Sequence, residues 1–175
     1  MNVPLTSLPD SARVWVYGTD RPLTPEEREA LLADLRAFVD IWTAHGAALR
    51  AGVEWVEDRF AIVAVDEASA PASGCSVDAM ARRLGSLEER LGCSLLDGTR
   101  VFYRDESGAI ESCARAEFRA RAMTGAISDA TPVFDPTIDT LGELRAGQLE
   151  RPASRSWHRQ LLAVHGKTPG RHRER

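Results

Sequence analysis

The sequence predicts an α+β protein with a ferredoxin-like core, a split β-α-β arrangement in which two helices cover one face of an antiparallel sheet. Two observations support this prediction. Patterns typical of strands and helices follow one another in the order strand, helix, strand, strand, helix, strand. At the centre of that order, residues 60–65 form an uninterrupted apolar run that ends at two carboxylates. A C-terminal extension follows the core.

The strands are predicted from runs of β-branched and aromatic residues. Residues 60–65, Phe-Ala-Ile-Val-Ala-Val, are typical of a strand that is covered on both faces. Residues 13–17 form a similar run near the N-terminus. Residues 53–57 alternate, and residues 57–59 predict the turn of a hairpin that leads into the central strand. Residues 99–104 predict the last strand of the core.

The first helix is predicted from its capping residues and apolar spacing. Thr24 is a suitable N-cap, Pro25 suits the first turn, and Glu27 is placed to close a capping box. We expect the helix to end near His45, with Gly46 as its C-terminal cap. Its apolar stripe consists of Leu31, Leu35, Phe38 and Trp42.

The second helix follows a loop of small residues. Ser73 and Ser76 are both suitable N-caps, because their hydroxyl groups can accept hydrogen bonds from free backbone N–H groups. Gly92 is expected to end the helix. Its apolar face consists of Val77, Met80, Leu84, Leu87 and Leu91.

The chain is expected to divide into four parts. These are an extended arm at residues 1–12, the ferredoxin-like core at 13–123, an extension at 124–165 that docks on the core, and a basic disordered tail at 166–175. Within the last part of the core, residues 110–122 predict a further strand or a partly helical segment. In the extension, Thr140 can cap a short helix, and residues 156–162 suggest another.

Composition restricts the function classes. The 175 residues contain 43% apolar and 27% charged residues, ordinary values for a globular protein. No apolar stretch approaches the roughly 18–20 residues that span a membrane, and the first ten residues lack a secretory pattern. Three widely spaced cysteines, an odd number, argue against a disulfide framework and favour a cytoplasmic location.

Charge is distributed unevenly along the chain. Residues 150–175 contain seven basic and two acidic residues, whereas the remainder contains 15 basic and 24 acidic residues. An acidic body repels phosphate backbones, which argues against nucleic-acid binding by the core. The basic end of the chain can bind nucleic acid, another protein or the acidic body itself.

The predicted topology brings together the end of the first helix, the end of the central strand and the start of the second helix. His45, Asp66 and Cys75 would then share one rim. A thiol and an imidazole oriented by an acid form a nucleophile–base pair for acyl transfer. The rim also provides candidate ligand-binding residues at a helix N-terminus, which favours anions. These are Ser73, Gly74, Ser76, Glu67 and Asp78.

Two other interpretations of the rim remain open. His45, Asp66, Glu67 and Asp78 offer the nitrogen and oxygen ligands of a divalent metal, but no metal-binding motif is present, and we expect neither a metal nor another cofactor. Alternatively, the serines only cap the helix, Cys75 is a small apolar residue, and the acidic residues are solvated.

Residues 13–17, 42–46 and 72–78 resemble a small family of uncharacterised bacterial proteins often labelled "ABC transporter ATPase". The resemblance covers about residues 12–160 and implies no activity or catalytic residue. The label lacks support, because Gly166-Lys167-Thr168 would need a glycine at position 161, which is Leu161, to complete a phosphate-binding loop.

The sequence therefore favours a binding or assembly protein that takes a small anionic ligand or a protein partner, including a second copy in a homodimer. The alternative is a hydrolase or acyltransferase that depends on Cys75 and His45.

Overall fold

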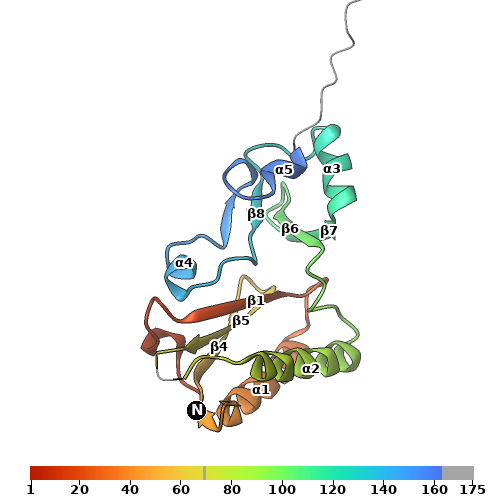
Figure 1. Cartoon of the computed structure of the whole chain (residues 1–175). Coiled ribbons are helices and arrows are strands. Elements are labelled where there is room, and N and C mark those ends of the chain that lie inside the picture. Colours follow the sequence, from red (N-terminus) through yellow and green to blue (C-terminus); the bar gives the residue numbers. More distant parts are fainter. Residues whose placement is uncertain (69, 163–175) are drawn as a thin grey trace, which may run out of the picture.

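A computed structural model describes residues 1–68 and 70–162 (Figure 1). The fold is mixed α and β, with antiparallel sheets, as the sequence predicts. None of the helices formed by the described residues is both long and apolar enough to cross a membrane. The predicted tail at residues 166–175 lies outside the described residues.

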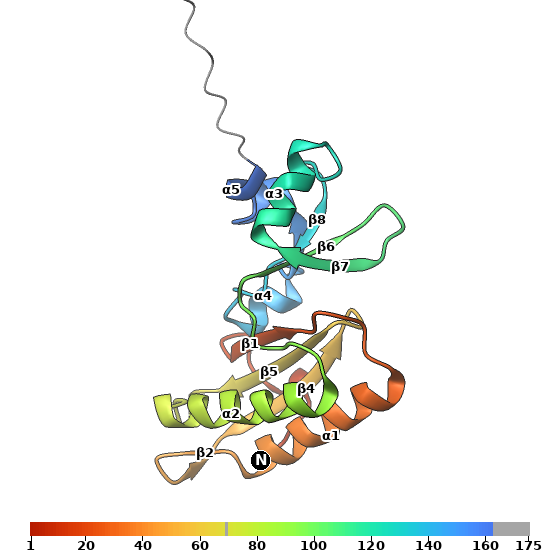
Figure 2. The same cartoon turned by 90° about the vertical axis from the view of Figure 1, so that its right-hand side faces the viewer.

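The first sheet has three strands in the order β1-β5-β4, with β5 antiparallel to both neighbours. Helices α1 and α2 cover one of its faces (Figure 2). The bounds of these elements are β1 Arg13–Gly18, α1 Pro25–Ile41, β4 Arg50–Val56, β5 Phe60–Asp66 and α2 Gly74–Leu91.

Strand β5 is buried on both faces, which confirms the interpretation of its apolar run. Ala61, Val63 and Val65 pack under the two helices, where Leu31, Leu35 and Leu84 are also fully buried. Phe60, Ile62 and Ala64 point to the opposite face and need a second layer to cover them. That second layer comes from the C-terminal half of the chain together with Leu5, Leu8 and Ala12 of the N-terminal arm.

The predicted caps of the two long helices are confirmed. The Thr24 hydroxyl accepts the N–H of Glu27 at 3.2 Å, and the Glu27 carboxylate accepts the N–H of Thr24 at 2.9 Å. Ser73 and Ser76 form the same reciprocal arrangement at the start of α2. Gly92 ends α2 in the left-handed region, with a φ of 59°.

The prediction that α1 continues to His45 is wrong. The helix ends at Ile41, and residues 43–48 form a small hairpin of β2 (Thr43–Ala44) and β3 (Ala47–Ala48). His45 and Gly46 form its turn with φ angles of 51° and 79°. A His-Gly pair suits such a turn, in which both central residues have positive φ. Gly46 therefore serves a hairpin and not a helix end.

The second sheet has four antiparallel strands in the order β7-β6-β8-β9. They are β6 (Arg100–Arg104), β7 (Ile110–Ala114), β8 (Pro132–Phe134) and β9 (Glu150–Pro152). A four-stranded ferredoxin-like sheet would instead place β6 beside β1. That arrangement is not confirmed, because β6 pairs with β7 and β8.

The apolar second face of the first sheet gives a physical reason for this difference. With both helices on one face, a four-stranded ferredoxin-like sheet would leave Phe60 and Ile62 exposed. In the structure the Phe60 ring lies 5.1 Å from Phe102 of β6 and 5.0 Å from Phe134 of β8. Gly18 allows this close approach, because a Cβ there would lie 2.5 Å from the Phe102 ring. Phe102 of strand β6 thus packs on the second face of the first sheet, against Phe60.

The remaining elements complete the second sheet and the edges of the first. Residues 110–123 form β7 followed by α3 (Arg115–Met123). The predicted strand and the predicted helical segment are therefore both present in part. Thr140 caps α4 (Leu141–Arg145) as predicted, and α5 (Arg159–Leu162) packs against α3. The 3₁₀ turns are η1 (Leu5–Ser7) and η2 (Ala153–Arg155). The N-terminal residues 1–3 pair with the outer edge of β4.

Candidate functional site

Part of the predicted rim is present. His45, Ser73, Cys75 and Ser76 line one shallow depression of about 280 Å³, whose apolar side is formed by Trp42 and its neighbours. The β2–β3 hairpin supplies His45, and the N-terminus of α2 supplies the thiol, which is exposed. The nucleophile–base pair of the sequence prediction thus borders one surface feature.

The predicted carboxylates lie apart from this depression and take part in the local fold. Asp66 accepts from Arg50 at 3.1 Å and from the N–H of Ala68 at 3.1 Å. Glu67 accepts the N–H of Ala72 at 3.0 Å and lies 3.8 Å from Arg13. Asp78 is on α2 and does not border the depression. No carboxylate of the predicted set therefore borders the depression with His45.

The two serines are occupied by capping. The Ser73 hydroxyl accepts from the Ser76 N–H at 3.2 Å, and the Ser76 hydroxyl accepts from the Ser73 N–H at 2.8 Å. The Ser76 hydroxyl also donates to the Ser73 carbonyl at 2.8 Å. Nothing lies within 4 Å of the position that a Cβ on Gly74 would occupy, so the helix start is open at that point.

The metal interpretation of the rim finds no support in the part of the chain that the structure describes. Within residues 1–68 and 70–162, no three side chains of His, Cys, Asp or Glu gather closely enough to hold a metal ion. Asp66 and Glu67 are already engaged by arginines, as given above.

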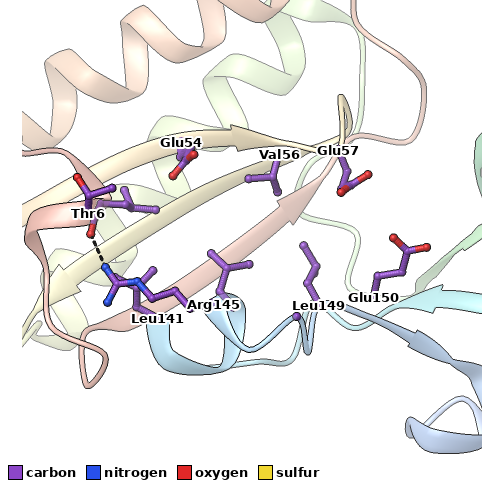
Figure 3. A pocket seen from close by; sticks show the side chains of 11 residues that line it. Thr6, Glu54, Val56, Glu57, Leu141, Arg145, Leu149 and Glu150 are labelled. Carbon is purple, nitrogen blue, oxygen red and sulfur yellow. Dashed lines mark hydrogen bonds between the residues drawn. The ribbon is translucent and has the colours of Figure 1, made fainter.

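A larger groove lies on the opposite face of the first sheet, between β4 and the α4–β9 segment (Figure 3). Its volume is about 470 Å³. The apolar floor consists of Leu5, Val56, Leu141, Leu144 and Leu149. The alternation of β4 places Glu54 and Val56 on this face, whereas Val53 and Trp55 face α1.

The groove contains several charges, most of which already have partners. Arg145 donates to the carbonyls of Leu5 and Leu8 at 3.0 and 3.1 Å and pairs with Asp10. Arg104 donates to Glu150 at 2.7 and 2.8 Å and to Glu57 at 2.9 Å. Glu54 is exposed and has no hydrogen bond or ion pair with any described residue.

Sequence reasoning did not identify this groove. Its walls come from η1, β4 and residues 141–150, three segments that lie far apart in the sequence. The one available signal was the position of Glu54 and Val56 on the same face of a predicted strand. Finding the other wall requires knowing that the second sheet folds over the first.

Comparisons of the chain with family models, with curated proteins and with solved structures each gave no match. The resemblance drawn from residues 13–17, 42–46 and 72–78 therefore stays a prediction from the sequence.

Proposed function

We propose that the protein is an interaction module whose groove between β4 and α4 binds a basic, partly apolar peptide segment. The observation that carries this proposal is the composition of the groove. Its floor is apolar, and the charge left without a partner among the described residues is the Glu54 carboxylate. An apolar side chain inserted in the floor and a cation beside Glu54 satisfy both features.

The edge of the sheet favours an extended segment. The N–H of Val3 donates to the Ala51 carbonyl at 2.8 Å, and the Ala51 N–H donates to the Met1 carbonyl at 3.2 Å. By the alternation of an antiparallel strand, the backbone groups of Val53 and Trp55 point toward the same edge. No bond from these outward groups to a described residue is present. A peptide that continues the pairing of the N-terminal arm would add a strand there.

A peptide of alternating Lys and Val, seven residues long, provides the test. Titrated into the full chain, it is expected to shift the amide NMR signals of Glu54, Val56 and Leu149. Glu54→Gln should weaken binding about 1.4- to fivefold, since an exposed ion pair contributes roughly 0.2–1 kcal/mol. Glu89→Gln, on an exposed position of α2, is the matched control and should bind as the wild type does. Shifts confined to other surfaces would contradict the proposal.

The second candidate function is a hydrolase or acyltransferase that uses Cys75 and His45. It is favoured by one observation, that both side chains border the same depression. Such an enzyme requires a thiolate near neutral pH, so Cys75 should react with iodoacetamide more than tenfold faster than free cysteine. His45→Ala should remove that advantage. A rate equal to that of free cysteine would exclude this candidate.

The state of the cysteines bears on the location of the protein in the cell. All three cysteines are free, with Cys93 and Cys113 buried, which supports the proposal of a reducing cytoplasmic location. A ferredoxin-like core stays a proposal, supported by the strand order β1-β5-β4 of the first sheet. A homodimer also stays a proposal, and light scattering of the full chain would measure its mass directly.

A further inference from the structure

A buried arginine lies outside both sites described above. Arg59, in the turn between β4 and β5, is only 4% exposed. Its side chain has no hydrogen bond or ion pair with any residue that the structure describes, and its Nε is buried without a partner. Burial lowers the pKa of this guanidinium, partly offset by the fields of Glu111 and Asp20. Buried charges are ordinarily paired, so this position calls for a partner.

The local backbone fixes Arg59 firmly. Glu57 and Asp58 have φ angles of 54° and 48°, and the N–H of Arg59 donates to Val56. The buried Thr19 donates to the Arg59 carbonyl from its N–H at 3.0 Å and from its hydroxyl at 3.2 Å. The turn therefore has little freedom to carry the side chain into solvent.

Arg59 borders a cleft of about 600 Å³. The cleft lies between residues 20–22, residues 57–59 and the β6–β7 hairpin, which projects on the side of the β1–α1 loop (Figure 2). Its lining includes three guanidinium groups and four carboxylates. Two of the guanidinium groups, Arg21 and Arg104, already pair with Glu27 and Glu150.

Three of the four carboxylates are also occupied. Asp20 accepts a hydrogen bond from the Ser94 N–H at 2.8 Å. Glu57 accepts one from Arg104 at 2.9 Å, and Asp58 accepts one from Arg28 at 3.1 Å. The fourth, Glu111, is exposed and forms no ion pair with Arg59 or with another described residue. Among the groups that line the cleft, Arg59 is thus the one buried charge without a partner in the described chain.

We propose that Arg59 binds the carboxylate of a small, singly charged metabolite in this cleft. A planar guanidinium matches a carboxylate in a two-bond arrangement, and its burial strengthens the interaction. The lining contains four carboxylates and three guanidinium groups, so its net charge is negative. It therefore repels a doubly charged phosphate more strongly than a singly charged carboxylate, which favours a monoanion. This site meets the peptide groove at Glu57, which lines both, but its binding group is Arg59, which does not line the groove.

Calorimetric titration of the full chain with acetate, pyruvate, lactate and inorganic phosphate tests the proposal. At least one of the three carboxylates is expected to bind saturably, and phosphate at least tenfold more weakly. Arg59→Met, which keeps the length of the side chain, should reduce carboxylate affinity at least tenfold. Binding of phosphate alone, binding that Arg59→Met leaves unchanged, or no binding of any carboxylate would overturn the proposal.

A second pair of measurements separates ligand binding from folding. Without ligand, Arg59→Met should melt at or above the wild-type temperature, because it removes a buried charge that has no partner. Glu111→Gln should keep wild-type stability and tighten carboxylate binding about two- to fivefold, because it removes a repelling charge. If Glu111 instead closes onto Arg59 in solution, both variants lose stability and Glu111→Gln gains no affinity, which would refute the assignment.

Discussion

The two sheets of this protein are stabilised by different means. The first sheet has strands of six and seven residues and two long capped helices. The described core between them is mainly aliphatic, includes the buried Trp42 and contains no histidine. The second sheet has strands of three to five residues, and its core is smaller. There the buried His158 ring stacks on Trp157 at 3.9 Å and lies 6.0 Å from Phe118.

The difference indicates which conditions each sheet responds to. A core of Leu and Val side chains depends on burial, which changes little with pH or salt. A core that includes an imidazole and is joined to its surroundings by arginine pairs depends on protonation and ionic strength. Acid and salt should therefore lower the stability of the whole protein mainly through contacts of the second sheet.

The largest expected effect comes from Phe60, where the two sheets meet. Its ring is fully buried and contacts Phe102 and Phe134 of the second sheet. Phe60→Ala should lower the free energy of unfolding by roughly 3–5 kcal/mol, measured by urea denaturation. Ile41→Ala, at a position that is 78% exposed, is the control and should change little. A small effect of Phe60→Ala would mean that the sheets do not support each other.

The next effect concerns acid and His158. Burial lowers the pKa of His158 to about 4, from 6.5 in an unfolded chain, with Asp135 opposing and Arg115 and Arg151 adding to the shift. Well above pH 6.5 the ring is neutral in both states. As pH falls from 6.5 to 4, the unfolded chain takes up the proton first, so the free energy of unfolding falls by about 3 kcal/mol.

Denaturation at pH 7 and pH 4.5 measures this loss. His158→Gln should lose less stability than the wild type between the two values, because it removes the titrating ring. His45→Gln, in the β2–β3 turn, should show the wild-type difference. Equal pH dependence in all three proteins would show that His158 is not the acid-sensitive group of the second sheet.

A smaller effect is expected from the arginine that joins the sheets. Arg104 of β6 pairs with Glu150 of β9 and with Glu57 of the β4–β5 turn, and its side chain is 26% exposed. Arg104→Met should lower the free energy of unfolding by about 1–2 kcal/mol, because it breaks charge-assisted bonds that are partly shielded from water. High salt should reduce the difference between variant and wild type. Arg119→Met, on an exposed position of α3, should be near neutral.

The first sheet was largely predictable because its information is local. The capping box of Thr24 and Glu27 and the apolar run at residues 60–65 each specify an element within a few residues. The end of α1 was misjudged, because Gly46 suits a hairpin turn as well as a helix cap. The local sequence around Gly46 does not distinguish a hairpin turn from a helix cap, because the difference depends on tertiary contacts.

The second sheet and both new sites depend on contacts that no local pattern specifies. Strand β6 packs where the first sheet has an uncovered apolar face. The contact of Phe102 with Phe60 can therefore be predicted only after the position of Phe60 in the first sheet is known. Of the predicted rim, His45 and Cys75 share a depression, whereas Asp66 is held by Arg50. The cleft beside Arg59 is formed with segments that lie about 40 residues before it and about 50 residues after it, so the residues next to Arg59 in the sequence gave no sign of the cleft.

The smallest effects come from two matched caps, one beside each sheet. Ser73 caps α2, which covers the first sheet, and Thr140 caps α4, which leads into β9 of the second sheet. Each serine or threonine side chain accepts a first-turn N–H, so Ser73→Ala and Thr140→Ala should each lower stability by about 1 kcal/mol.

Hydrogen exchange then distinguishes one cooperative unit from two. If the protein unfolds as a unit, either substitution should accelerate exchange of the slowest amides in β5 by the same factor of about five. If the second sheet opens separately, Thr140→Ala should accelerate exchange in β8 and β9 and leave β5 unchanged. We expect the first result, because the fully buried Phe60 ring is packed between Phe102 and Phe134 and neither sheet can open without exposing it.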